Sequence, residues 1–252
     1  MSKIFDRLFY VGPLGLGDSF VNCGAVHYFA DRCLELHVPV WPKFYKTLSC
    51  LYQDFPNIKV IPLGHYDDGE NQYVAEHKLA RILPTDLIRT KNINDKLSAV
   101  LWDVQIYANY EIPFSYRYTN FRPPKHVEGS DELYHQLSQG EKYILVHRSS
   151  SKYPNGIPIN IDNFRFRENL PNYKVIEIKD NITDNMMQYI KLIEHAQEIH
   201  CVASSFHCLV DSLHSYTNAR LYFHDIRGDA IMKINSYDNN YRWIIVNYGE
   251  KV

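Results

Sequence analysis

The sequence lacks long apolar runs and a large net charge, and we expect no secretory leader. Nowhere do about 18 consecutive apolar residues occur, which excludes a membrane-spanning helix but leaves an interfacial one open. The first residues carry Asp6, Arg7 and Asp18 in place of an apolar signal segment. With 27 basic and 29 acidic residues the formal charge is -2, too small to attract nucleic acid generally. We therefore expect a cytoplasmic protein with neither a nucleic-acid partner nor a transmembrane segment.

Several chemical signatures are also missing. The five cysteines are odd in number and show no CxxC or metal-ligand spacing, which indicates a reducing compartment. No Asp-x-Asp pair is present, and the Asp67-Asp68 pair falls in a stretch without clear secondary structure. The GxGxxG fingerprint of dinucleotide-binding proteins is absent too. We expect no metal and no bound cofactor.

What is present is an alternation of short apolar runs and helical segments. A length of 252 residues and a 45% hydrophobic composition fit an ordinary globular protein of one or two domains. In the first half the pattern predicts strands and helices in the order βαβαβ. The predicted segments are a strand at Leu8–Val11, a helix from Ser19 to about Leu36, an extended segment at Val38–Trp41, a helix at Pro42–Asp54, a strand at Ile58–Pro62, a helix at Asn92–Tyr110 and an extended segment at Ile112–Tyr118.

The same alternation restarts after a polar, proline-bearing stretch, Arg122–Ser130. Parallel neighbours need crossover connections, so both halves predict parallel sheets of the Rossmann-like α/β class. We place the boundary between domains 1–125 and 126–252. The predicted segments of the second half are helix 130–139, strands at Tyr143–His147, Lys174–Ile178, Ile199–Ala203 and Arg220–His224, and a helix with its apolar face at Met186, Ile190, Ile193 and Ala196.

The first candidate site is the turn Gly12–Ser19, which joins a strand to a helix. Glycines such as Gly15 and Gly17 let the backbone approach a ligand closely, and the start of a helix favours negative charge. The alternative is that Asp18 or Ser19 simply caps the helix. The residues alone leave both interpretations open.

Two further candidate loops follow strands of the second half. In the first, Arg148 and Lys152 lie among three serines, a set suited to phosphate oxygens, although a solvated polar loop is equally ordinary. In the second, Ser204 and Ser205 precede a helix that carries His207 and Asp211. Hydroxyls and first-turn N–H groups suit a diphosphate, and residues four apart share a helical face. The alternative is a serine cap, a packed histidine and a surface aspartate.

Taken together, these segments resemble the heptosyltransferase-like glycosyltransferases. The strand, glycine turn and Gly17-Asp18 are similar to the opening of that family, and Tyr153-Pro154 after Lys152 resembles its phosphate-binding loop. Val202–Leu213 is similar to the family's small-residue turn and helix near the donor, although Val202-Ala203-Ser204 stands where the family has Asp-Thr-Gly. It also looks like the helix of other GT-B enzymes whose acidic residue, here Asp211, holds the nucleotide ribose.

The resemblance implies a divergent, small member with the GT-B fold, in which two Rossmann-like domains face a cleft. It implies that the N-terminal domain binds a saccharide acceptor, with Asp18 as general base beside Gly15, Gly17 and Ser19, and that the C-terminal domain binds a nucleotide-sugar. The diphosphate would meet Arg148, Lys152, Ser204, Ser205 and His207, and Asp211 would contact the ribose. Transfer would be inverting and metal-independent.

Three other functions compete with this interpretation. A nucleotide-sugar epimerase would also have two such domains and a carboxylate, and a binding module without catalysis would keep the fold alone. An NAD-linked oxidoreductase lacks support, because the glycine fingerprint and its acidic partner are missing.

Overall fold

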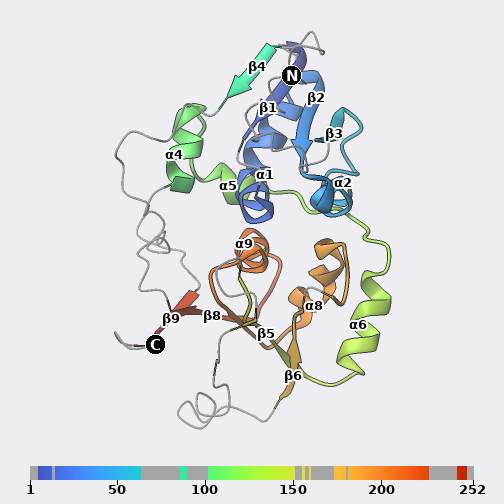
Figure 1. Ribbon diagram of the computed structural model, residues 1–252, viewed down its shortest axis with the longest axis vertical. Coiled ribbons are helices and arrows are strands. Elements are labelled where there is room, and N and C mark those ends of the chain that lie inside the picture. The colour runs from blue at the N-terminus through green and yellow to red at the C-terminus, as the bar shows by residue number, and fades with distance from the viewer. Residues whose placement is uncertain are drawn as a thin grey trace. The chain divides into compact units, whose positions relative to one another are not determined.

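The chain forms two compact units, Met1–Val127 and Glu128–Val252, in the computed structural model (Figure 1). The structure describes residues 5–12, 15–63, 86–89, 102–150, 155–156, 159, 173–179, 181–226 and 243–248. We predicted a boundary between residues 125 and 126, and the roles predicted for the two halves stay predictions. Among the described residues, no helix is long and apolar enough to cross a membrane.

The first unit is built on a parallel sheet with the strand order β3-β2-β1-β4. The predicted βαβαβ order is confirmed, and β4, which we did not predict, extends the sheet beyond β1. Its elements are β1 (Phe5–Val11), α1 (Leu16–Ala30), β2 (Cys33–Val40), η1 (Pro42–Phe44), α2 (Tyr45–Leu51), β3 (Ile58–Pro62), β4 (Asp86–Arg89), α4 (Trp102–Asn109) and α5 (Tyr116–Thr119).

The predicted bounds of the first helix are wrong. The first helix begins at Leu16 and ends at Ala30, so that residues from Cys33 on belong to β2 and not to a helix reaching Leu36. Pairing with β1 on one side and β3 on the other outweighs the helical reading of this apolar stretch. The predicted helix at Asn92–Tyr110 is seen as α4, and its earlier residues lie outside the described ranges.

The segment Ile112–Tyr118 is not extended, as predicted, but turns into the short helix α5. Local hydrogen bonds close it, among them Tyr116 N–H to the Pro113 carbonyl at 2.9 Å. Arg117 is buried within α5 and forms an ion pair with Asp103 of α4, whose side chain is also buried. This ion pair links the two helices. The periodicity of apolar residues could not predict it, because both partners are charged.

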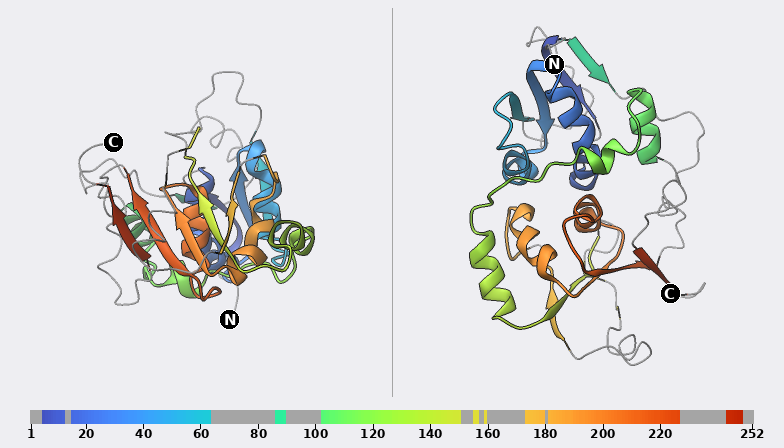
Figure 2. Two further views of the ribbon diagram at one scale, coloured as in Figure 1. Left: turned by 90° about the horizontal axis from the view of Figure 1, so that it is seen from below. Right: turned by 180° about the vertical axis from the view of Figure 1, so that it is seen from behind.

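The second unit holds a five-stranded parallel sheet with the order β6-β5-β7-β8-β9. The four predicted strands are confirmed, and β9 at the edge beyond β8 was not predicted (Figure 2, left). Its elements are α6 (Ser130–Ser138), β5 (Tyr143–His147), β6 (Lys174–Glu177), η4 (Met186–Tyr189), α8 (Ile190–His195), β7 (Glu198–Cys201), α9 (Ser205–Ser212), β8 (Arg220–Asp225) and β9 (Trp243–Asn247).

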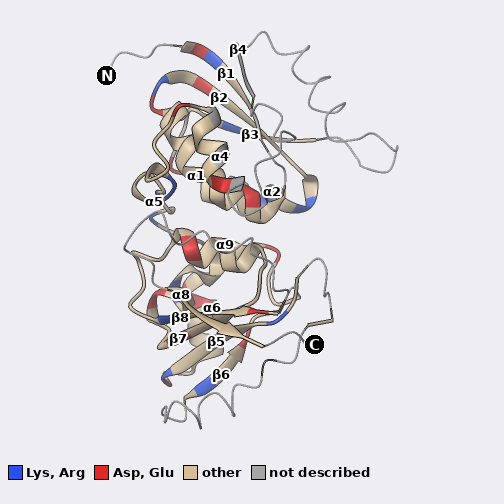
Figure 3. Cartoon of the chain, turned by 90° about the vertical axis from the view of Figure 1, so that its left-hand side faces the viewer, with Lys and Arg blue, Asp and Glu red and all other residues tan. Residues whose placement is uncertain are grey.

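Helices cover one face of this sheet and an apolar cluster covers part of the other. Tyr143 of β5 donates a hydrogen bond to the Leu192 carbonyl of α8 at 2.8 Å, and its ring meets Tyr134 of α6. The alternate residues of β5, Ile144 and Val146, pack on the opposite face. Both faces are therefore buried, which explains why β5 is apolar up to its final histidine and carries no charge along its length (Figure 3).

The close contact between α1 and α5 depends on a glycine. Gly24 lies in the buried part of α1, where a Cβ would collide with the backbone carbonyl of Tyr116. The Asn120 amide reinforces the contact by donating to the Gly24 carbonyl at 2.8 Å. No other residue type fits at this position without moving α5.

We expect Gly24→Ala to destabilise the protein by about 1–3 kcal/mol, because backbone atoms cannot move aside as a side chain would. Helix propensity alone predicts the opposite sign, since alanine in a helix interior is favoured over glycine by about 0.5–1 kcal/mol. Denaturant unfolding of the two proteins measures the difference. A stabilised variant would show that the α1–α5 contact is loose.

Candidate functional site

The first candidate site lies at the carboxyl edge of the second sheet. The chain leaves β5 to form β6 on one side and later β7 on the other, so the strand order reverses between β5 and β7. In open parallel sheets, ligands bind outside the strand ends at such a reversal. The residues that follow β5 and β7 are therefore the candidates.

His147 ties these two strand ends together. It is the last residue of β5 and only 3% exposed, and its Nδ1 lies 3.1 Å from the Ser204 hydroxyl beyond β7. Its Nε2 lies 3.3 Å from the hydroxyl of Ser149. The Phe206 ring packs against the imidazole with 5.2 Å between centroids. One buried ring thus holds two hydroxyls at the strand reversal.

Ser204 is the N-cap of α9, which confirms the alternative interpretation of this residue as a helix cap. Its hydroxyl oxygen accepts the His207 backbone N–H at 3.2 Å, and Ser205 is the first helical residue. A cap does not exclude a ligand, because the first-turn N–H groups of a helix have no intrahelical partner and favour anions. The prediction that Ser204 and Ser205 bind a diphosphate is untested.

Arg148 is already held by the protein. Its Nε lies 3.4 Å from a Glu177 carboxylate oxygen of β6, and its Nη1 donates to the Ile159 carbonyl. Its side chain is 25% exposed. The second predicted cation, Lys152, lies outside the described residues together with Tyr153-Pro154.

His207 and Asp211 share one face of α9, as their spacing predicts, but that face turns toward the sheet. The His207 ring lies 4.9 Å from Phe223 and 4.6 Å from Trp243, centroid to centroid. Asp211 is 7% exposed and accepts the Trp243 indole N–H at 2.9 Å. Both are packed side chains, and roles in binding phosphate or ribose stay predictions.

In the first unit, Asp18 lies in the first turn of α1. The cap residue of this helix is Gly15, so neither Asp18 nor Ser19 is the cap that the alternative interpretation required. The Asp18 carboxylate instead folds back and accepts the Gly15 N–H. Burial raises the pKa of Asp18, and this hydrogen bond opposes the rise. The result is a carboxylate with increased affinity for a proton.

The neighbouring predicted residues support this turn. A Cβ on Gly15 would meet the Asp18 carboxylate, so the absence of a side chain there makes room for it. The Ser19 hydroxyl donates to the Gly15 carbonyl at 3.0 Å, and Gly17 is a partly exposed helical residue. Gly15 and Ser19 thus shape the turn, and their proposed role at an acceptor is untested.

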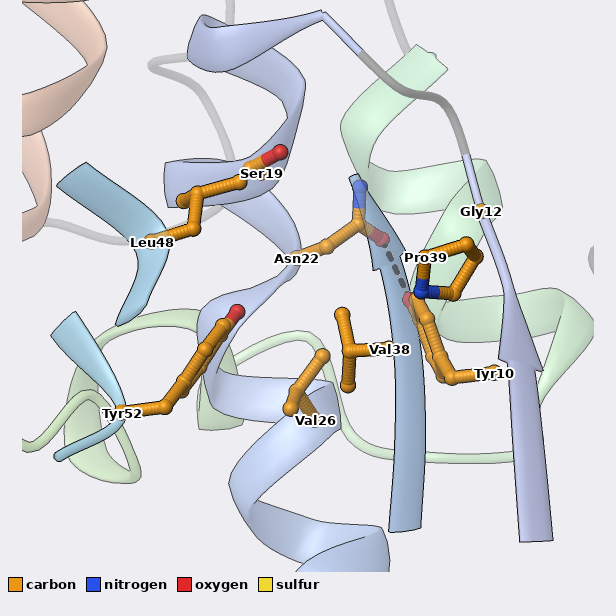
Figure 4. A pocket seen from close by; sticks show the side chains of 9 residues that line it. All are labelled: Tyr10, Gly12, Ser19, Asn22, Val26, Val38, Pro39, Leu48 and Tyr52. Carbon is orange, nitrogen blue, oxygen red and sulfur yellow. Dashed lines mark hydrogen bonds between the residues drawn. The ribbon is translucent and has the colours of Figure 1, made fainter. Parts of the chain in front are cut away.

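A small pocket lies beside this turn and includes residues that we did not predict (Figure 4). The Tyr10 hydroxyl donates to the Asn22 side chain at 2.7 Å, while the Asn22 amide donates to the Asp18 carbonyl at 2.7 Å. A volume of about 20 Å³ holds a water molecule but no sugar ring. Its lining residues are Tyr10, Gly12, Ser19, Asn22, Val26, Val38, Pro39, Leu48 and Tyr52.

Asn22 could have been found from its position four residues after Asp18, on the same face of α1. His27 of α1 belongs to the core. It is fully buried and stacked on Phe55 at 4.2 Å, and burial lowers its pKa to about 4. A ligand cannot reach it.

Comparison with known proteins finds likeness in fold and not in sequence. No family model and no curated protein sequence matches the chain. A glycosyl transferase family 9 structure from Veillonella parvula matches with a TM-score of 0.56 at 9% identity, covering 100% of this chain and 90% of that one. The E. coli heptosyltransferase WaaC, solved with ADP-2-deoxy-2-fluoro heptose, matches with a TM-score of 0.50 at 10% identity, covering 95% and 92%.

A third match is the iron-containing dodecameric glycosyltransferase TibC from E. coli, with a TM-score of 0.51 at 10% identity. It covers 88% of this chain and 59% of that one. Two parallel α/β sheets and these matches identify the fold as that of the GT-B glycosyltransferases. The predicted fold class is confirmed, whereas the cleft between the two halves stays a prediction.

We expect Ser204→Ala to lower the free energy of unfolding by about 1 kcal/mol, because the His207 N–H loses its cap. Ser204→Asn should retain most of the stability, since asparagine caps equally well. Ser205→Ala is the matched control, because Ser205 is inside the helix and should cost little. Equal losses at the two serines would contradict the capping role.

Proposed function

We propose that the protein transfers a glycosyl group from a nucleotide-activated sugar to a hydroxyl of a saccharide acceptor, with inversion and without a metal ion. The observation that carries the proposal is the partly buried carboxylate of Asp18, with its raised pKa, at the strand-to-helix turn of a GT-B fold. The likeness to WaaC supports a nucleotide-sugar as the donor. The donor's base and sugar are left open.

Asp18 is the proposed general base. Desolvation makes its carboxylate a stronger proton acceptor than an exposed aspartate, while the Gly15 N–H keeps it aimed. The acceptor hydroxyl gives its proton to this carboxylate as its oxygen bonds to the anomeric carbon. The bond from that carbon to the diphosphate oxygen breaks, and the electron pair leaves with the diphosphate.

The leaving diphosphate needs positive groups, because negative charge builds on it in the transition state. Arg148 is the proposed main contact, since its pairing with Glu177 pre-orients the guanidinium without hiding it. The hydroxyls and amides of Ser204 and Ser205 would add hydrogen bonds, together with Lys152. His207 would support α9 from inside, and Asp211 is proposed to meet the ribose.

We expect Asp18→Asn to reduce the turnover number by about 100-fold to 10,000-fold, because the amide cannot take the acceptor's proton. The amide oxygen can still accept the Gly15 N–H, so folding and donor affinity should be preserved. Steady-state kinetics beside donor binding measures both. Asp31→Asn is the control, because Asp31 is an exposed aspartate at the opposite end of α1.

Full activity in Asp18→Asn would remove Asp18 from the chemistry. A matched fall in rate and donor affinity would make it a binding residue instead. Isomerisation of the nucleotide-sugar without transfer would favour an epimerase, and donor binding without any turnover would favour a binding module.

We expect transfer to continue in excess EDTA, because the side chains and helix-start N–H groups can stabilise the leaving group. In the part of the chain that the structure describes, no cluster of three or more His, Cys, Asp or Glu side chains could hold a metal. The Asp67-Asp68 pair lies outside the described ranges. Activity that is lost in EDTA and restored by manganese or iron would overturn metal independence.

A further inference from the structure

A chain of buried polar groups lies on the face of the second sheet opposite α9. It consists of Glu198 and His200 in β7, His224 in β8 and Tyr248 directly after β9. Phe223 contacts His207 of α9, so the next residue, His224, points to the other face. Glu198 and His200 are two apart in β7 and share that face.

The contacts between these four side chains form one continuous line. His200 Nε2 lies 3.3 Å from the Glu198 carboxylate, and His200 Nδ1 lies 2.9 Å from His224 Nε2. His224 Nδ1 lies 2.6 Å from the Tyr248 hydroxyl oxygen. Glu198, His200 and His224 are each at most 3% exposed, whereas Tyr248 is half-buried. The Tyr222 ring stacks on the His200 ring, with 4.6 Å between centroids, and so fixes the orientation of the imidazole.

The line runs from the amino end of the sheet to its carboxyl end. Glu198 is the first residue of β7, and Tyr248 follows the last residue of β9, which pairs with the end of β8. Burial raises the pKa of Tyr248 and lowers that of His224; the charge of Arg148, which follows β5, opposes the first shift and adds to the second. Tyr248, the half-buried end of the line, therefore lies at the same carboxyl edge of the sheet as Arg148, the proposed diphosphate contact.

The carboxylate at the buried end sets the direction of every hydrogen bond. A carboxylate only accepts, so His200 donates from Nε2 and accepts at Nδ1 when it is neutral. His224 then donates from Nε2 and accepts at Nδ1. Burial, helped by His200 and Arg148, lowers the pKa of His224 to about 3, which keeps that ring neutral at neutral pH. The Tyr248 O–H must therefore donate inward, and its oxygen can only accept from outside.

We propose that Tyr248 is a further ligand-binding residue that accepts a hydrogen bond from a sugar hydroxyl of the nucleotide-sugar, with Glu198, His200 and His224 as its positioning residues. The proposal rests on the proposed donor site. It gives two residues at the carboxyl edge of the second sheet different roles. Arg148 donates hydrogen bonds to phosphate oxygens, and Tyr248 accepts a hydrogen bond from a hydroxyl. The hydroxyl belongs either to the ribose or to the transferred sugar.

The test compares wild type, Tyr248→Phe and Glu198→Leu, which removes the terminal acceptor, at pH 8. Calorimetry measures the binding of ADP-glucose, UDP-glucose and GDP-mannose, the matching nucleoside diphosphates, and pyrophosphate. We expect both variants to bind the nucleotide-sugar about 3- to 10-fold more weakly, the size of one neutral hydrogen bond. Pyrophosphate, which has no hydroxyl, should bind equally to all three. A loss shared by the nucleoside diphosphate assigns the ribose hydroxyl, and a loss confined to the nucleotide-sugar assigns the transferred sugar.

Tyr216→Phe is the matched control, because Tyr216 is 44% exposed in the same unit and outside the chain of contacts. If Tyr248→Phe folds poorly, the nitrogen NMR spectrum of the wild-type imidazoles decides the direction of the hydrogen bonds. Both rings should carry their proton on Nε2, and Glu198→Leu, which removes the acceptor, should give a mixture of tautomers. A proton on Nδ1 of His224 overturns the proposal, as does unchanged sugar binding in both variants. If the wild-type protein binds none of the nucleotides, both the proposed function and this inference are wrong.

Discussion

Parallel strand pairing is the constraint from which the other features of both units follow. Every pairing between described strands is parallel, and parallel neighbours cannot be joined by a tight turn. Each connection must cross a face of its sheet, which buries that face and makes the strands apolar. The carboxyl ends also fall at one edge. For this reason the side chain of His147 contacts that of Ser204, which is 57 residues away in the sequence.

Runs of apolar and β-branched residues were predictable because these residues are typical of strands and, in β5, of burial on both faces. Ile58–Pro62 and Tyr143–His147 were predicted with the bounds that the structure shows. The strand Asp86–Arg89 was missed because it has only two apolar residues between charged ones. Ile112–Tyr118 was misread because aromatic residues suit strands, whereas the buried pairing of Arg117 with Asp103 favours a helix there.

The candidate site divides in the same way between local and distant causes. Asp18 and Ser204 could be located from the sequence, since a glycine turn or a serine before a helix is a local signal. What each side chain does with its neighbours depends on the tertiary fold. The Asp211 carboxylate meets Trp243, and Arg148 meets Glu177, because sheet order makes neighbours of segments that are distant in the chain. The turn at Gly15 is the exception, because the glycine that accommodates the Asp18 carboxylate is only three residues away.

The bond from Trp243 to Asp211 also affects how the protein is made. A ribosome adds about 5–20 residues per second, so the 32 residues between the two take roughly 2 to 6 s to synthesise. Until β9 has joined the sheet, the Asp211 carboxylate and the His207 ring of α9 lack the indole that covers them. The second unit therefore cannot complete the packing of α9 before the β9 segment has been synthesised.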